Sequence, residues 1–171
     1  MIYFGGNEIG SVKWGSLDVS KAYLGSQEVW SAHTEPSRAL KFTALEGSAL
    51  SVQSYGSAPS ITLEYSFDGR TWNPMTVNET WISVDAGDHC YVRGVNNEKL
   101  GSSLTNYNGF AIFGAVKAEG PIVSLLDPET ETPAEDFALA SLFQSAKCLK
   151  DASGLTFPET ITGKSAFQAL F

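Results

Sequence analysis

The chain has 171 residues, and 43% of them are hydrophobic, which is enough to bury the core of one ordinary domain or of two small ones. Nineteen acidic side chains against eleven basic ones give a formal net charge of −8. Because no cluster of Lys or Arg accompanies this acidity, the sequence argues against nucleic acid and anionic membrane as partners.

The residue composition favours a mainly β protein. Only 18% of the residues are charged, while 16 glycines and an aromatic share of 12% suit short strands and tight turns. Cys90 and Cys148 lie far apart in regions of different pattern, so we expect two buried thiols and neither a disulfide nor a metal site. Without an apolar run of about 18 residues or a cationic, apolar leader, the sequence predicts no membrane span and no secretion signal.

A ten-residue repeat opens the chain. Three copies align without gaps, and each reads as an apolar residue, Gly, a small residue, any residue, an acid and a β-branched apolar residue. They occupy residues 4–9, 14–19 and 24–29. A Gly-small pair between two apolar residues suits a tight reversal that needs positive φ, so each copy predicts a short β-arm.

The repeat segment, residues 1–32, contains few apolar side chains for a self-sufficient fold. Units below about 40 residues usually need a staple or a partner, so we expect this segment to pack on a neighbour or to oligomerise. The alternative is a disordered leader that happens to repeat. Trp and Tyr side chains, which are unusual in disordered tails, disfavour that alternative.

Residues 21–30 resemble the YLGSxEVW arms found at the N-termini of phage virion proteins and tail fibres. In such proteins the start of the chain is commonly attached to the particle, so the resemblance implies an anchoring role for residues 1–32. Strand pairing or aromatic insertion would make the attachment. The partner-binding residues expected in the repeat are Phe4, Trp14, Tyr23, Leu24, Val29 and Trp30.

After a short Pro-containing linker, residues 38–126 show the alternation of a β-sandwich. Between residues 61 and 67, Ile, Leu, Tyr and Phe alternate with polar residues, which predicts a strand with one buried face. Further strands are expected elsewhere, including 110–117 and 122–126. Seven or more short strands with regular turn signals predict an antiparallel immunoglobulin-like sandwich, with a small barrel as the alternative.

Residues 66–72 are similar to the Asp-box hairpin of sialidases and other β-proteins, shortened by one residue before the Gly. Even there the box is structural. Asp68 and Gly69 suit the turn, the Asp68 and Thr71 side chains can bond its backbone, and Trp72 is expected to pack beneath it. A glycosidase would need a second carboxylate across a cleft, and spacing alone nominates none.

Residues 127–136 form an acidic, Pro-containing linker that marks a module boundary. Its five acids favour a solvated linker over a calcium site, because prolines interrupt them and EF-hand spacing is lacking. At its end Thr132, Pro133 and Glu135 have the pattern of a capping box. The pattern predicts a helix that continues through Phe143.

Residues 138–143 and 166–171 are similar to each other, so that Ala138 corresponds to Ala166 and Phe143 to Phe171. A repeat of this length with inward Leu, Phe and Cys is typical of stacked leucine-rich units. Residues 141–161 resemble the surface leucine-rich repeats of the BspA-like type, although a Leu directly follows Cys148. We therefore expect residues 137–171 to be the start of an α/β leucine-rich-repeat region, truncated so that one apolar face needs a continuation or a partner.

The sequence shows no recognisable catalytic constellation. His33 and His89 have no sequence neighbours that make a triad or a zinc pair, and no nucleotide-binding or nucleophile-elbow motif occurs. We therefore expect no enzymatic activity, no cofactor and no bound metal.

The resemblances together imply a non-enzymatic phage virion protein, a head or tail fibre or another appendage. It would attach to other virion proteins through its N-terminus and present its repeats to a host surface glycan or protein, and fibres of this kind are often trimers. One alternative is a bacterial cell-surface leucine-rich-repeat adhesin, which would need a signal peptide or a lipidated Cys. The other is a glycan-active or glycan-binding module, based on the Asp-box similarity and exposed aromatic residues.

Overall fold

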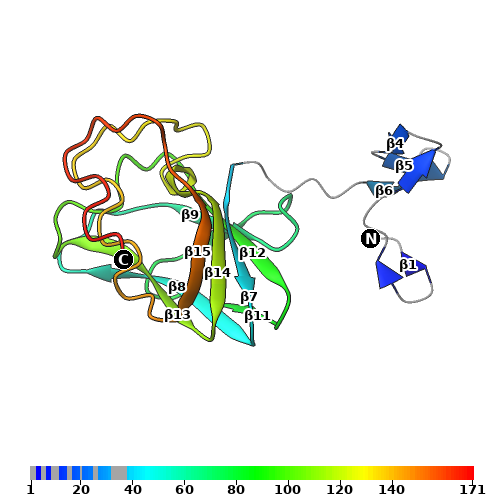
Figure 1. Ribbon diagram of the computed structural model, residues 1–171, viewed down its shortest axis with the longest axis horizontal. Helices are drawn as coiled ribbons and strands as arrows, with labels where there is room; N and C mark the ends of the chain where they lie inside the picture. The colour runs from blue at the N-terminus through cyan, green and yellow to red at the C-terminus, as the bar shows by residue number, and fades with distance from the viewer. Residues whose placement is uncertain are drawn as a thin grey trace. The chain divides into compact units, whose positions relative to one another are not determined.

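The computed structural model describes residues 3–4, 7–8, 12–14, 17–19, 21–24, 27–31 and 38–171. The chain divides into two compact units, Met1–Glu35 and Pro36–Phe171. Both are built from strands, and the described residues contain one short 3-10 helix and no α-helix (Figure 1). The prediction of a mainly β protein is therefore confirmed.

Three two-stranded antiparallel pairs make up the described part of the first unit. Their strands are β1 (Tyr3–Phe4), β2 (Asn7–Glu8), β3 (Val12–Trp14), β4 (Leu17–Val19), β5 (Lys21–Leu24) and β6 (Gln27–Ser31). β1 pairs with β2, β3 with β4 and β5 with β6. In sequence, the Gly-small pair of the ten-residue repeat separates the two strands of each pair, and this is the composition that two-residue hairpin connections favour.

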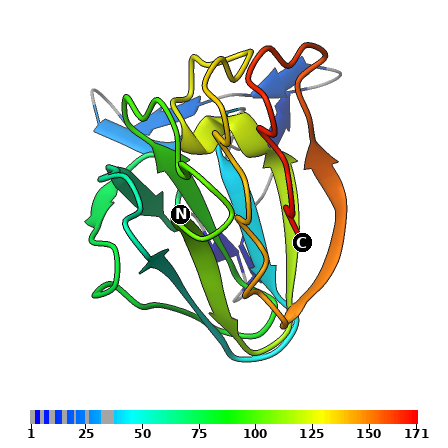
Figure 2. The same ribbon diagram turned by 90° about the vertical axis from the view of Figure 1, so that its left-hand side faces the viewer.

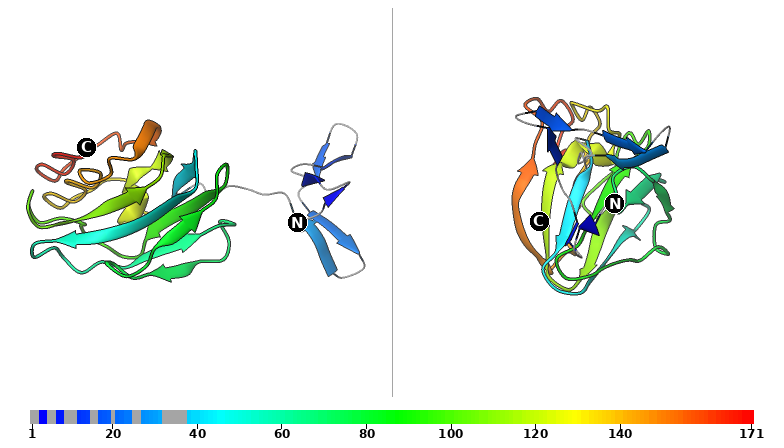
Figure 3. Two further views of the ribbon diagram at one scale, coloured as in Figure 1. Left: turned by 90° about the horizontal axis from the view of Figure 1, so that it is seen from below. Right: turned by 90° about the vertical axis from the view of Figure 1, so that its right-hand side faces the viewer.

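Nine strands and one 3-10 helix build the described part of the second unit. Its elements are β7 (Leu40–Ala44), β8 (Ser48–Tyr55), β9 (Leu63–Ser66), β10 (Asn73–Met75), β11 (Ile82–Val84), β12 (His89–Gly94), β13 (Tyr107–Phe113), β14 (Val116–Pro121), η1 (Ile122–Leu125) and β15 (Leu149–Thr156). They form a 6-stranded sheet in the order β10-β9-β12-β7-β14-β15 and a 3-stranded sheet in the order β11-β8-β13. All neighbours are antiparallel except β14 and β15. Figure 3 (left) shows the sheets packed as layers.

The core lies between the two sheets because the strands alternate buried and less buried residues. In β7, Leu40, Phe42 and Ala44 are buried and alternate with half-buried polar residues. The Phe42 ring meets that of Phe110 from β13 across the layers, with centroids 4.8 Å apart. Burying each large apolar side chain stabilises the fold by about 1.5–3 kcal/mol, so this layer interface is the main source of the unit's stability.

The strand order differs from that of the immunoglobulin fold. An immunoglobulin constant-type sandwich divides its strands as ABED and CFG, so its first strand stands at a sheet edge. Here the first strand of the unit, β7, lies inside the larger sheet between β12 and β14. The two packed sheets agree with the predicted sandwich. The order of the strands within the sheets does not support the prediction that the sandwich is immunoglobulin-like.

Two predicted strands differ from the observed elements. The strand predicted over 110–117 is interrupted at Gly114, which lies between β13 and β14 and has a φ of 73°. The strand predicted over 122–126 is replaced by η1, whose residues are all buried. The Ser124 hydroxyl donates to the Pro121 carbonyl over 2.6 Å and closes this turn.

The helix predicted from Pro133 through Phe143 is absent, so that prediction is wrong. Phe137 and Ser141 each have a φ of 58°, in the left-handed region, which interrupts an α-helix. A helix bonds each N–H to a carbonyl one turn earlier, whereas alternate N–H groups of this segment donate to carbonyls much later in the chain, as Leu139 does to Ala166. The expected α/β class of residues 137–171 is wrong for the same reason, because this segment contains no helix.

Residues 136–143 and 164–171, which we call the first rung and the second rung, lie side by side. Backbone N–H groups at alternate positions of the first rung donate to carbonyls of the second over 2.7–3.0 Å. The donor and acceptor pairs are Phe137–Lys164, Leu139–Ala166, Ser141–Gln168 and Phe143–Leu170. The conformation repeats as well, since Ser165 and Ala169 have φ values of 55° and 51°, like their equivalents Phe137 and Ser141.

The rungs belong to successive coils that also pair through β14 and β15. Figure 2 shows β15 beside β14, and the two strands run parallel. The coils approach closely at Gly163, where a Cβ would overlap the carbonyl of Glu135. The first rung pairs in turn with the sandwich, because the Phe110 N–H donates to the Leu142 carbonyl over 2.8 Å. The sandwich, the first rung and the second rung therefore form consecutive layers.

Candidate functional site in the N-terminal hairpins

Three of the six predicted partner-binding residues occupy equivalent positions in the hairpins. Each is the last residue of its first strand, and it pairs with the first residue of the second strand. The pairs are Phe4–Asn7, Trp14–Leu17 and Leu24–Gln27. The backbone therefore repeats in step with the ten-residue repeat of the sequence. The contacts that these side chains make lie outside the part of the chain that the structure describes.

The third hairpin differs from the others by a bulge. Tyr23 pairs with Glu28 and Ala22 pairs with Trp30, so Val29 is an extra residue in β6. An extra residue bends a strand, increases its twist and changes the direction of the side chains that follow it. The bulge separates the pairing of Tyr23 from that of Trp30, and these are the two aromatic residues that the sequence places in this hairpin.

Each hairpin has unsatisfied strand edges among the described residues. Its two strands pair with each other and with no other described strand, so each strand has one edge without a ladder partner. Isolated two-stranded hairpins of this length are marginal in water, and a free edge can add a strand from another chain. Strand addition is therefore the chemistry that this backbone offers.

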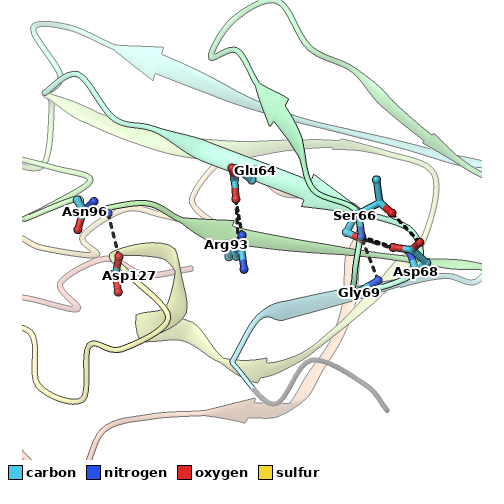
Figure 4. A network of polar contacts seen from close by, with 8 residues as sticks. Glu64, Ser66, Asp68, Gly69, Arg93, Asn96 and Asp127 are labelled. Carbon is cyan, nitrogen blue, oxygen red and sulfur yellow. Dashed lines mark hydrogen bonds and ion pairs between the residues drawn. The ribbon is translucent and has the colours of Figure 1, made fainter. Parts of the chain in front are cut away.

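The Asp-box-like segment of the second unit is a structural turn. The Asp68 carboxylate accepts hydrogen bonds from the backbone N–H groups of Arg70 and Thr71 over 2.8 and 2.7 Å. The hydroxyls of Ser66 and Thr71 also donate to it. These donors, the Thr71 N–H first, hold the pKa of Asp68 well below its usual range. Every polar contact of the carboxylate in Figure 4 thus goes to its own turn, and Gly69 has the expected positive φ of 68°.

Glu64, which lies on the strand that leads into this turn, is also paired. Arg93 donates from Nε and Nη2 to the same oxygen of Glu64 over 2.9 and 2.7 Å (Figure 4). The guanidinium carbon of Arg93 lies 3.9 Å from the centroid of the Trp72 ring, which is a cation–π contact. Both carboxylates therefore have structural partners, since Glu64 pairs with Arg93 and Asp68 bonds its own turn.

The acidic linker is tied to the sandwich by ion pairs and backbone hydrogen bonds. Arg38 lies 3.1 Å from Glu129 and 3.6 Å from Glu131, and the Asn96 N–H donates to Asp127 over 3.0 Å. Hydrogen bonds from the backbone N–H groups of Glu129, which has the larger effect, and of Asn96 lower the pKa of Asp127. Within the described ranges, no three His, Cys, Asp or Glu side chains come together in a way that could hold a metal ion.

The two cysteines have different environments. Cys90 is buried in the core, and burial raises the pKa of its thiol to about 12. Cys148 is half-buried, and both are free thiols. A thiol with a raised pKa is a poor nucleophile, so Cys90 serves as a small apolar core residue.

One aromatic pair is exposed on the sandwich. The rings of Trp81 and Phe113 have centroids 5.1 Å apart, and their side chains are 43% and 64% exposed. Trp81 directly precedes β11, and Phe113 ends β13 of the same sheet. Sequence reasoning identified neither residue as part of a site, because strand periodicity does not show which outward aromatic residues will meet.

The comparisons with known proteins found no matching family model, no matching curated protein and no matching solved structure. In the described part of the chain, no helix has the length and apolar character needed to cross a membrane. The candidate site is therefore defined by the repeated hairpin geometry and by the residue pattern that the hairpins carry.

Proposed function

We propose that this protein is a non-enzymatic structural protein of a phage virion, a head or tail fibre or another appendage, that attaches to the particle through residues 1–32. The observation that carries the proposal is the repeated hairpin register. Three equivalent hairpins, each with strand edges that no other described strand pairs, suit repeated strand addition to a larger scaffold. The resemblance of residues 21–30 to phage arms supplies the identity of that scaffold.

In this proposal the six partner-binding residues act at the contact with the particle. Phe4, Trp14 and Leu24 recur at one position of the hairpin, so a repetitive partner surface could accept all three in the same way. The bulge at Val29 bends β6, so the aromatic residues of the third hairpin should face in other directions than the equivalent positions of the first two hairpins. Large aromatic side chains contribute much of the energy of protein interfaces, so these residues would dominate the affinity.

The second unit serves as a spacer and as the base of a repeat region in this proposal. The ladder between the two rungs supports assigning residues 137–171 to the start of a leucine-rich-repeat region, which would face a host surface glycan or protein. The protein would work as a homo-oligomer, a trimer in the simplest fibre, because the fibres that it resembles are often trimers.

Deletion of residues 1–32 tests the attachment. The truncated protein should keep the melting transition of the second unit, since that unit has its own core, but should no longer co-purify with particles in quantitative mass spectrometry. A second variant replaces Phe4, Trp14 and Leu24 by Ser and leaves the three Gly-small pairs intact, and it should also lose incorporation because it lacks three of the proposed contact side chains. Undiminished incorporation of the deletion variant would overturn the proposal.

A bacterial surface adhesin is the second candidate, and the stacked rungs are the observation that favours it. Stacked repeats make extended binding surfaces on adhesins as well as on fibres. Immunolabelling of uninfected cells distinguishes the two. Protein on the surface of cells that carry no particles would favour the adhesin and contradict the virion proposal.

A further inference from the structure

We infer that the outer edge of the second rung is a docking edge for one more polypeptide rung, which runs parallel to it and offers backbone carbonyls and an aromatic ring. This inference concerns residues 164–171 and is independent of the attachment proposed for the N-terminal hairpins. Three observations support it: the polarity of the hydrogen bonds, the exposure of the second rung and the stacking of three Phe rings.

The backbone-to-backbone hydrogen bonds that join the sandwich to the first rung, and the first rung to the second, all have the same polarity, while the Lys164 N–H at the start of the second rung donates back to the Asp136 carboxylate. The sandwich donates N–H groups of Leu100 and Phe110 to carbonyls of the first rung over 2.6 and 2.8 Å. The first rung then donates its N–H groups at alternate positions to carbonyls of the second. The second rung repeats the conformation of the first, so its equivalent N–H groups point to the next layer. They belong to Ser165, Phe167, Ala169 and Phe171, and no described residue accepts from them.

The outer edge of the second rung presents backbone N–H groups, so it can pair only with a segment that offers backbone carbonyls. Unpaired N–H groups carry partial positive charge, so they require carbonyl oxygens, and an extended segment in the register of a rung provides them. A second copy docked by the same edge through a two-fold axis would place donors against donors. The complementary occupant is therefore a further rung of this repeat type.

The second rung is buried on its inward face and exposed on its outward side. Ala166 and Leu170 are buried like their equivalents Ala138 and Leu142, so the inward face is complete. The outward positions differ, because Phe143 is 3% exposed while its equivalent Phe171 is 63% exposed. A further rung would cover Phe171 as the second rung covers Phe143.

The aromatic stack gives the register in which a further rung would dock. The rings of Phe110 and Phe143 have centroids 5.6 Å apart and an interplanar angle of 16°. The rings of Phe143 and Phe171 repeat this geometry at 5.5 Å and 15°. Each layer contributes one ring, so the occupant should place an aromatic side chain over the outer face of Phe171.

The test extends the full chain at its end by one additional copy of residues 144–171. We expect the amides of Phe167, Ala169 and Phe171 to exchange more slowly by about tenfold, measured by hydrogen exchange, because they gain carbonyl partners. Two matched extensions serve as controls. One has the final Phe replaced by Asp, and the other has the same composition in scrambled order.

Two results would overturn the inference. One is unchanged exchange of these amides in the extended chain, or equal protection by the scrambled extension. The other is a concentration-dependent dimer of the unextended chain that protects the same amides, seen by sedimentation and hydrogen exchange together. F171S in the extended chain provides a second readout, since it should remove the protection while the unextended F171S chain keeps its fold.

Discussion

The hairpins of the first unit and the rungs of the second show two different ways in which repetition in sequence becomes repetition in structure. The two strands of each hairpin pair residues that are near neighbours in sequence, such as Trp14 with Leu17. The rungs are joined by hydrogen bonds between residues far apart in the chain, such as Leu139 and Ala166. A local repeat forms one unit at a time, whereas each rung depends on the layer beneath it.

Because each rung depends on its neighbouring layer, the buried ring of Phe143 should contribute far more to the free energy of unfolding than the exposed ring of its equivalent, Phe171. Phe143→Ala removes a ring that is stacked between Phe110 and Phe171, so we expect the free energy of unfolding to fall by about 3–5 kcal/mol. Phe171→Ala, at the exposed equivalent position, should cost less than about 1 kcal/mol. Urea denaturation of both variants measures the contrast. Equal losses would show that the two rungs do not stack in the order described.

Gly163→Ala tests whether the two coils need their close approach. The added Cβ would overlap the backbone carbonyl of Glu135, and overpacking of this kind costs about 1–3 kcal/mol. Gly47→Ala is the matched control, because a Cβ there meets nothing within 4 Å. A Gly163→Ala variant as stable as the Gly47→Ala variant would contradict the close contact.

Asp68 tests a turn that is as local as the hairpins but lies within the second unit. The pKa of Asp68 is lower in the folded protein than its ordinary value of 3.8. The ionised carboxylate therefore stabilises the fold above pH 3.8, and this stabilisation is lost as the pH falls from 3.8 through the folded-state pKa. Asp68→Ala should cost about 1–3 kcal/mol at pH 7, because charge-assisted hydrogen bonds to the turn disappear. Below pH 4 the stabilities of the variant and the parent should converge. Constant separation between pH 7 and pH 2 would contradict this role.

Gly15→Val should have the smallest effect and is confined to one hairpin. A β-branched residue disfavours the positive φ that a two-residue connection needs, so the pairing of β3 with β4 should be lost. The other hairpins should keep their cross-strand nuclear Overhauser effects, and the melting transition of the second unit should move by less than about 1 °C. Simultaneous loss of all three hairpins would show that they are coupled.

Much of the local architecture could be predicted from the sequence. The Gly-small pairs lie where the strands of each hairpin are separated, because a two-residue connection has few chemical solutions. The strand at Leu40–Ala44 follows its alternation of apolar and polar residues. The Asp68 turn follows from side chains that bond their own backbone. In each case the deciding interaction lies within a few residues.

The candidate site was predictable only in part. The six residues Phe4, Trp14, Tyr23, Leu24, Val29 and Trp30 follow from the repeat, and three of them occupy equivalent register positions. The bulge at Val29 could not be read from the sequence, because an extra residue changes the pairing without changing the residue pattern. The Phe110, Phe143 and Phe171 stack was missed for a related reason, since Phe110 lies in a strand outside the rung repeat.

By itself the sequence determined the mainly β character, the hairpin repeat and the correspondence between residues 138–143 and 166–171, since local turn chemistry and periodicity encode all three. The tertiary structure alone decided that residues 136–143 form a rung in place of the predicted helix, because alternate N–H groups of this segment donate to carbonyls in the distant segment 164–170. It also decided the position of β7 inside the larger sheet. Long-range pairing overrode local propensity at these places, and no capping pattern reports which distant edge a segment will meet.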